Sequence, residues 1–266
     1  MSNVKNPLVR VAGKDYTLKL PKDYLSFSQI DCYLTCPKQY EFSYVEGKKS
    51  AGTIEQFEGT VMHALLNDNS RYYIDKKKHM RMDDAEMLYT VQLQDHCDDT
   101  ELKMTVKQKD AIQDRAMGFI EKFWREGKGP NIQPIACEER FEHRFAGVPV
   151  VGYIDLIEEW CVTDYKVTAS SEYYDAEKSM QLDIYSVVSG KPVASYCCFE
   201  KRTGKIIWDT AQARNLVKVN RWLQVVVSRV AEGISKGVFP PCDPNKNRWC
   251  SARWCAHHSY CAGLYQ

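Results

Sequence analysis

Two short apolar segments, each interrupted by one acidic residue, limit most strongly what this chain can fold into. They are Gly152–Ile157, which contains Asp155, and Val162–Lys166, which contains Asp164. Runs of this kind are typical of strands, and a tight turn between them would make an antiparallel pair in which Asp155 faces Asp164. Opposed residues share one face, with Cβ atoms about 5 Å apart. Lys166, two residues after Asp164, is expected on that face as well.

Two facing carboxylates repel each other unless a positive charge lies between them. Oxygen ligands with an open side suit Mg²⁺ or Mn²⁺, and a nearby lysine can orient water or offset charge on a phosphorus centre. The pattern therefore indicates hydrolysis of a phosphodiester. The alternative is a surface hairpin whose acids face water and pair with lysines, because a D-x-K pattern alone is common.

The remaining periodicity predicts an α/β core with helical and cysteine-rich additions. Ser26 is expected to begin a helix, with Gln29 completing a capping box. Further helices are expected over 59–66, 84–127, 172–189 and 211–235, and strands over 135–145, 149–157, 160–167, 193–199 and 205–209. We interpret residues 1–266 as a single domain, with a helical part at 25–130, a catalytic core at 131–236 and a tail at 237–266.

The eleven cysteines constrain the cellular compartment. Their number is odd, we find no apolar signal segment near the N-terminus, and no stretch reaches the ~18 apolar residues that a membrane span needs. We therefore expect a reducing, cytoplasmic location (the host cytoplasm if the chain is encoded by a phage) and no membrane partner. In such a compartment, clustered cysteines indicate metal binding rather than disulfides. The formal net charge of +1 does not indicate a nucleic-acid partner.

The C-terminal tail carries three closely spaced cysteines, Cys250, Cys255 and Cys261. Four thiolates hold either zinc or an iron–sulfur cluster, so a fourth ligand must come from elsewhere. Cys242 is one candidate. His257 and His258 offer a different solution, a zinc site completed by two of the tail cysteines.

Other candidate residues are weak when each is considered alone. Gln181 and Tyr185 are four residues apart and share one helix face. His63 is a lone helical histidine, which is more often a core or surface residue than a ligand. Glu138 precedes the first acidic strand, where a solvated role is more common.

The ordered set of motifs resembles the RecB-like branch of the PD-(D/E)XK nucleases, which includes AddB-type subunits, CRISPR-associated exonucleases with an iron–sulfur cluster, and phage exonucleases. The resemblance covers roughly residues 25 to 262. It rests on Ser26–Tyr40 with Cys36-Pro37, on Gly59–His63 as G-x-x-x-H, on Glu138 followed by Gly152–Asp155, on Asp164-Tyr165-Lys166 as D-x-K, and on Gln181 with Tyr185 as Q-x-x-x-Y. It implies a restriction-endonuclease-like core, a mixed sheet flanked by helices.

The resemblance also implies roles for these residues. The catalytic metal, Mg²⁺ or Mn²⁺, would be bound by His63, Asp155, Asp164 and the backbone carbonyl of Tyr165. Lys166 would position the attacking water or stabilise the transition state, and Gln181 and Tyr185 would order the site and the DNA backbone. Glu138 would contribute to catalysis, although the adjacent Glu139 is an alternative.

For the tail, the resemblance selects Cys36 as the fourth ligand of a 4Fe–4S cluster with Cys250, Cys255 and Cys261. The spacing departs from the C-x-x-C of RecB-type relatives, and zinc is the second choice. Such a clamp would pin the N-terminal helix to the tail and add stability, by several kcal/mol in a chain-entropy model.

The expected function is thus that of a metal-dependent DNA exonuclease acting on single-stranded ends, in recombination, repair or phage DNA processing. The sequence has no G-x-x-x-x-G-K-[ST] phosphate loop, so a separate helicase or recombination partner would supply any motor activity. The first alternative is a catalytically inactive DNA-binding or scaffold subunit, whose signature would be loss of an acid or of Lys166. The second is an iron–sulfur electron carrier or zinc-bearing regulator, which would leave the acids and Lys166 unexplained.

Overall fold

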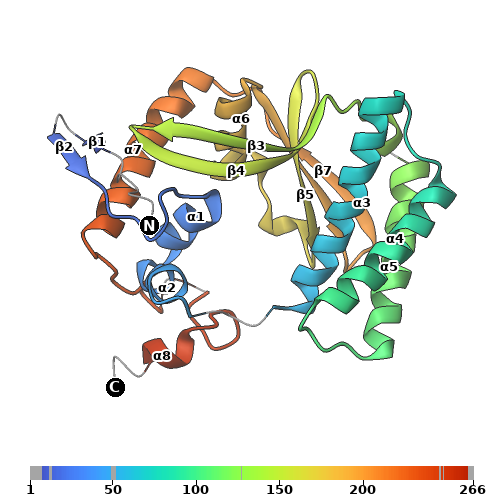
Figure 1. Cartoon of the computed structure of the whole chain (residues 1–266), viewed down its shortest axis with the longest axis horizontal. Coiled ribbons are helices and arrows are strands. Elements are labelled where there is room, and N and C mark those ends of the chain that lie inside the picture. Colours follow the sequence, from blue (N-terminus) through green and yellow to red (C-terminus); the bar gives the residue numbers. More distant parts are fainter. Residues whose placement is uncertain are drawn as a thin grey trace, which may run out of the picture. The chain divides into compact units, whose positions relative to one another are not determined.

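The structure is a computed structural model that describes residues 8–11, 14–48, 52–126, 128–245, 247 and 249–262. The chain forms two compact units that alternate along the sequence (Figure 1). The first unit contains Met1–Ala51, Phe141–Gly152 and Val217–Gln266, and the second contains Gly52–Arg140 and Tyr153–Leu216. No helix in the described ranges combines the length and the apolar character that crossing a bilayer requires.

The second unit is built on a five-stranded mixed sheet in the order β3-β4-β5-β6-β7. The strands are β3 Ala136–Phe145, β4 Val148–Ile157, β5 Cys161–Thr168, β6 Val193–Glu200 and β7 Lys205–Thr210, and β3 and β4 continue into the first unit. β5 pairs with β6 in parallel, whereas β4–β5 and β6–β7 are antiparallel. The mixed sheet expected from the sequence is confirmed.

Helices cover both faces of this sheet. α3 (Ile54–Lys76) packs on β5 and α5 (Val106–Arg125) on β7, and α4 (Met82–Asp99) packs against both of these helices (Figure 1). α6 (Met180–Ser189) contacts β5 and β6. Because strand side chains alternate between the two faces of a sheet, every second residue of β5 and β6 points toward α6. The core under α3–α5 is apolar, with Leu65, Ile120, Leu156 and Phe199 almost completely buried.

The register of the acidic hairpin agrees with the prediction. Leu156 pairs with Thr163 and Ile157 with Val162, so the next opposed positions are Asp155 and Asp164. There the regular ladder gives way, because the Asp155 carboxylate accepts a hydrogen bond from the Tyr165 backbone N–H at 2.8 Å. The Tyr165 N–H therefore donates to the Asp155 side chain instead of to a backbone carbonyl of β4.

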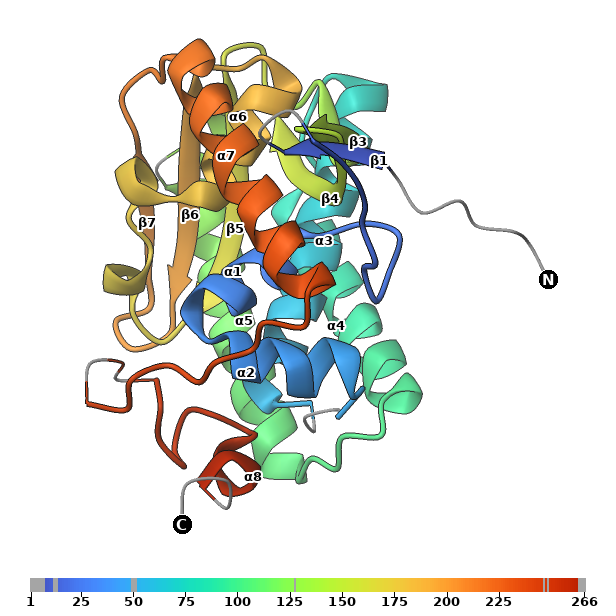
Figure 2. The same cartoon turned by 90° about the vertical axis from the view of Figure 1, so that its left-hand side faces the viewer.

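The first unit gathers segments from both ends of the sequence. It contains the hairpin of β1 (Leu8–Val11) and β2 (Lys14–Thr17), the short helices α1 (Phe27–Thr35), α2 (Pro37–Tyr40) and η1 (Glu41–Val45), and the C-terminal helices α7 (Leu216–Ser235) and α8 (His258–Ala262) (Figure 2). The Tyr33 hydroxyl donates to the Val238 carbonyl at 2.8 Å. Gly233 permits this approach, since a Cβ there would lie 2.1 Å from the Tyr33 oxygen.

The capping box expected at Ser26 forms only in part. The Ser26 side chain accepts from the Gln29 backbone N–H at 3.3 Å, as predicted. The Gln29 side chain does not return to Ser26, because its amide oxygen accepts a hydrogen bond from the Tyr40 hydroxyl at 3.2 Å. Pro37 opens the next helix, as expected of a residue that ends or restarts one.

Four expected helices have different limits in the structure. The helix expected over 59–66 is the middle of α3, which begins at Ile54 after the capping box of Thr53 and Gln56 and ends at Lys76. The helix expected over 84–127 is two helices, because Thr105 and Gln108 form a capping box that begins α5. The helix expected over 172–189 begins only at Met180, after two 3₁₀ turns at Ser171–Tyr173 and Ala176–Lys178. The helix expected from Ala211 begins at Leu216, because the N–H groups of Ala211 and Arg214 donate instead to the carbonyls of Ala194 and Pro192.

Candidate active site

Three side chains from three elements of the second unit come together beside the acidic hairpin. They are His63 of α3, Glu138 of β3 and Asp155 of β4, and one ligand atom from each lies within 4.8 Å of the others. The His63 Nδ1 atom is 3.6 Å from an Asp155 carboxylate oxygen. The His63 ring also hydrogen-bonds to the Tyr165 backbone, so the carbonyl expected as a ligand borders the group. One imidazole and two carboxylates are a donor set that suits a divalent cation such as Mn²⁺ or Mg²⁺.

The backbone at Glu138 is strained. Its φ is +45°, in the left-handed region that residues with a Cβ rarely adopt. Strain of this kind clusters at functional sites. The positive φ interrupts the regular alternation of side chains along β3. Glu138 is half-buried beside His63 and Asp155, whereas Glu139 is exposed. Of the two adjacent acids, the structure therefore brings Glu138 to His63 and Asp155.

Asp164 lies next to this group but is not one of its three members. Its carboxylate is held on both oxygens: Oδ1 accepts from the Gln181 amide at 2.6 Å, and Oδ2 is 2.6 Å from the Lys166 ammonium. Gln181 also donates to the Tyr185 hydroxyl at 2.9 Å, as their spacing on one helix face suggested. Gln181, Tyr185 and Lys166 thus converge on Asp164, which is 2% exposed.

The two carboxyls of the hairpin differ in electrostatic environment. Burial and the nearby Asp164 charge raise the pKa of Asp155 well above its ordinary value, against the lowering effect of the Tyr165 N–H. Burial alone would lower the pKa of Lys166, but the Asp164 carboxylate raises it above its ordinary value, so this side chain remains an ammonium. Burial lowers the pKa of His63 and favours the neutral imidazole that binds metals.

An open groove of about 660 Å³ runs beside these residues. Its wall is formed by the N-terminal half of α3, by His96 of α4 and by β5, and it includes His63, Glu138 and Lys166. Gly59 lies in this wall, and a Cβ there would meet no atom within 4 Å. The groove therefore borders two members of the three-residue group, His63 and Glu138, and also Lys166.

Several residues of the site were not found from the sequence. Tyr174 and Tyr196 lie against the Lys166 ammonium, His96 lines the groove, and Arg71 lowers the pKa of Glu138 against the raising effect of burial. Arg71 had a sequence signal, since it follows His63 by eight residues on α3 and so lies on the same helix face. The two tyrosines and His96 depend on long-range pairing that the sequence alone does not reveal.

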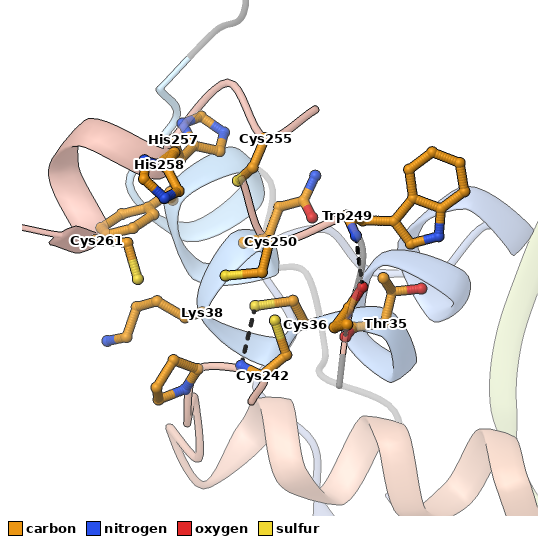
Figure 3. A pocket seen from close by; sticks show the side chains of 14 residues that line it. Thr35, Cys36, Lys38, Cys242, Trp249, Cys250, Cys255, His257, His258 and Cys261 are labelled. Carbon is orange, nitrogen blue, oxygen red and sulfur yellow. Dashed lines mark hydrogen bonds between the residues drawn. The ribbon is translucent and has the colours of Figure 1, made fainter. Parts of the chain in front are cut away.

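A second constellation lies in the first unit, where five cysteines line one cavity (Figure 3). They are Cys36 from the end of α1 and Cys242, Cys250, Cys255 and Cys261 from the tail. The Cys242 N–H donates to the Cys36 sulfur at 3.4 Å. Burial and the neighbouring Cys36 and Cys250 thiols raise the pKa of Cys242 to about 12, and the other thiols also raise that of Cys261. The five sulfur atoms thus face a common space and would repel one another as thiolates.

The family model of the PD-(D/E)XK nuclease superfamily matches residues 24–262. The chain belongs to this superfamily. No curated protein matches the sequence. Among solved structures, a "Putative exonuclease" from Eubacterium rectale superposes with a TM-score of 0.50 at 11% identity, over 86% of this chain and 88% of that one.

The likeness to the solved structure shows a shared fold, and its low identity transfers no residue roles. Membership of the superfamily shows that the chain is a nuclease by descent. Superfamily members generally use Mg²⁺ or Mn²⁺, and the His63, Glu138 and Asp155 group is where the described structure offers suitable ligands.

Proposed function

We propose that this protein is a Mg²⁺- or Mn²⁺-dependent DNA exonuclease that hydrolyses phosphodiester bonds at single-stranded ends. The observation that carries the proposal is the placement of the His63, Glu138 and Asp155 group beside the Lys166–Asp164 ion pair in one open groove. Ligands for a cation and a fixed ammonium are the two features that phosphodiester hydrolysis needs in one place.

In this proposal each residue has a separate task. His63, Glu138 and Asp155 would hold the divalent cation, which offsets phosphate charge and lowers the pKa of a bound water. Lys166 places its ammonium where charge develops on the phosphate oxygens. Asp164 fixes that ammonium at 2.6 Å, and Gln181 fixes Asp164 from the other side.

The groove favours a single strand as substrate. Its wall along α3 offers room beside His63 and Lys166, and we propose that a single strand lies there. Gln56 and Thr60 line the same wall and offer polar groups to a sugar–phosphate backbone. A separate helicase or recombination partner would present the unwound strand.

Three labelled substrates test this preference: an end-labelled linear single strand, an end-labelled blunt duplex and an internally labelled, covalently closed single-stranded circle. We expect rapid loss of the linear strand in Mn²⁺ or Mg²⁺, slow loss of the duplex, an intact circle and no reaction in EDTA. The groove residue Gly59 supplies a structural check, because Gly59→Phe should slow cleavage by filling the path, whereas Gly118→Phe should not. Opening of the circle at the rate of the linear strand would overturn the requirement for an end.

We further propose that Cys36, Cys250, Cys255 and Cys261 bind a 4Fe–4S cluster. Zinc would draw its thiolates to within about 4 Å of one another, given Zn–S bonds of about 2.3 Å. Within the described part of the chain, no three of these thiols have their sulfur atoms within 4.8 Å of each other. A spacing wider than one zinc ion would impose is compatible with the larger four-iron cluster.

The contacts of His257 support this choice over a mixed zinc site that would use this histidine. His257 is 4% exposed, and its Nε2 atom lies 2.9 Å from the Ser43 hydroxyl. Its ring also packs against Phe42, at 5.5 Å between centroids. A side chain held in this way serves to join the tail to η1 and is poorly placed as a fourth ligand.

A further inference from the structure

The parallel pairing of β5 with β6 brings two aromatic rings to Lys166. Asp164 pairs with Tyr196 and Lys166 pairs with Cys198, and all four side chains point to the same face because residues two apart on a strand do so. Lys166 turns its ammonium back to Asp164. That position brings the ammonium beside Tyr196, the cross-strand neighbour of Asp164.

Two tyrosine rings contact this ammonium. The Lys166 Nζ atom lies 5.7 Å from the ring centroid of Tyr174 and 5.8 Å from that of Tyr196. The two rings meet edge to face, with centroids 5.3 Å apart and an interplanar angle of 63°. Both distances to the ammonium fall within the ~6 Å over which a cation is attracted to an aromatic face, and the attraction grows when the cation is desolvated.

The ring hydroxyls make further hydrogen bonds. The Tyr196 hydroxyl lies 2.6 Å from the Ser179 side-chain oxygen, which also caps α6 by accepting from Leu182 N–H at 3.1 Å. The Tyr174 hydroxyl hydrogen-bonds to the Thr168 side chain. Tyr196 is 5% exposed, so its ring has little freedom to move.

We propose that Tyr174 and Tyr196 are positioning residues that fix the Lys166 ammonium against Asp164 and beside the groove. The proposal rests on the proposed nuclease function and deepens it. A lysine side chain has four rotatable bonds. The ion pair with Asp164 fixes only the distance between the Lys166 ammonium and one carboxylate oxygen, so the ammonium could still move around that oxygen. The two rings occupy the space into which the ammonium could otherwise move. This matters because displacing a catalytic group by about 1 Å can lower the rate about a hundredfold. Neither ring needs to touch the substrate.

The test compares leucine with phenylalanine at both positions. Tyr174→Leu and Tyr196→Leu remove the aromatic face, and we expect each to lower kcat about 10- to 100-fold while KM for single-stranded DNA stays within about twofold. Tyr174→Phe and Tyr196→Phe keep the face and lose only the hydroxyl, so they should retain kcat within about threefold. Tyr173→Leu, at the neighbouring exposed tyrosine, is the matched control and should behave as wild type.

A second readout does not depend on cleavage. The unfolding temperature is measured for wild type, Lys166→Met, Tyr174→Leu and the double variant. Because the ring and the ammonium interact, the loss in the double variant should be smaller than the two single losses together. Tyr174 is only partly buried, which keeps this series foldable even if Tyr196→Leu is not.

The outcomes separate this inference from the nuclease proposal. A wild-type protein that cleaves no DNA would refute the nuclease proposal, and the unfolding series would still test the contact between ring and ammonium. Active wild type with unchanged kcat in both leucine variants would overturn the inference. So would equal loss in the phenylalanine and leucine variants, which would assign the effect to the hydroxyls, or a rise in KM alone, which would assign the rings to substrate binding. Additive losses in the unfolding series would also count against it.

Discussion

At the scale of single residues, the two hairpin acids are in different electrostatic states. Asp164 is compensated by the Lys166 ammonium and by the Gln181 amide. The Asp155 side chain is 13% exposed, accepts the Tyr165 N–H at 2.8 Å and lies near two other acids. Burial and the Asp164 charge therefore raise its pKa well above the ordinary value. Asp155 is therefore the carboxyl that gains most when a cation enters the group.

This difference predicts the effect of Asp155→Asn on stability. Without metal, the wild-type folded state holds a proton on Asp155 more tightly than the unfolded chain does, so its stability should fall as pH rises from the ordinary pKa of 3.8 through the raised value. Asp155→Asn should unfold at a higher temperature than wild type at neutral pH in EDTA, and Mn²⁺ should stabilise only the wild type. Thermal unfolding followed by fluorescence measures both effects. A variant less stable than wild type in EDTA would contradict this view of the site.

The strained backbone at Glu138 predicts which of two adjacent acids binds the cation. Glu138→Gln should weaken Mn²⁺ binding at least about tenfold, because one of three converging ligands loses its charge. Glu139→Gln, at the exposed neighbour, is the matched control and should leave the affinity unchanged. Isothermal titration with Mn²⁺ gives both constants, and equal losses in the two variants would mean that Glu139 contributes as much as Glu138.

At the scale of elements, a buried carboxylate ties α3 to α5 and to the turn after β6. Glu58 is 4% exposed and accepts from Arg115 at 2.8 and 3.2 Å and from Lys201 at 3.2 Å. Two cations on one carboxylate satisfy both of its oxygens. The start of α3, which carries His63 one turn later, is thereby fixed to the remainder of the second unit.

We predict that Glu58→Ala destabilises the fold by about 2–3 kcal/mol, because two partly buried cations lose their common partner. Glu121→Ala on α5 removes an exposed i, i+4 pair with Arg125 and should cost at most about 0.5 kcal/mol. Urea unfolding monitored by circular dichroism supplies both values. If both variants lost the same small amount of unfolding free energy, the Glu58 ion pairs would contribute no more to stability than an exposed pair does.

Features set by neighbouring residues in the sequence could be predicted, whereas features set by contacts between distant segments could not. The hairpin register was readable because strand alternation has a period of two, so the spacing from Asp155 to Asp164 fixes which side chains share a face. The break between α4 and α5 was missed because helix-compatible charged residues continue on both sides of the Thr105 capping box. The positive φ of Glu138 and the rings around Lys166 depend on tertiary contacts, and no local pattern records them.

At the scale of the whole molecule, residues from the two ends of the sequence meet in the first unit. Hydrogen bonds that join them include Lys38 N–H to the Pro240 carbonyl at 3.2 Å, the Tyr33 hydroxyl to the Val238 carbonyl at 2.8 Å, and Cys242 N–H to the Cys36 sulfur at 3.4 Å. A metal group bound by residues of both ends would add a link between them. A cluster on Cys36 and the tail thiols would supply such a link.

This view predicts a coloured protein. Anaerobically purified wild type should be brown, because thiolate-to-iron charge transfer absorbs in the visible. Cys36→Ala should lose the colour and the iron and should lower the unfolding temperature. Cys97→Ala, which removes a partly buried thiol from α4, should keep both. Metal analysis that finds one zinc and no iron per chain would mean that these thiols bind zinc instead.

The most direct test of the central claim is cleavage of end-labelled single-stranded DNA by wild type and by Lys166→Ala in Mn²⁺ and in EDTA. The account predicts that wild type degrades the strand only with the metal, and that Lys166→Ala slows cleavage at least about a hundredfold with its fold intact. Lys178→Ala, at a lysine whose side chain is 84% exposed, controls for loss of one surface charge and should cleave as wild type does. Cleavage by Lys166→Ala at the wild-type rate, or no cleavage by wild type with either Mn²⁺ or Mg²⁺, would contradict the account.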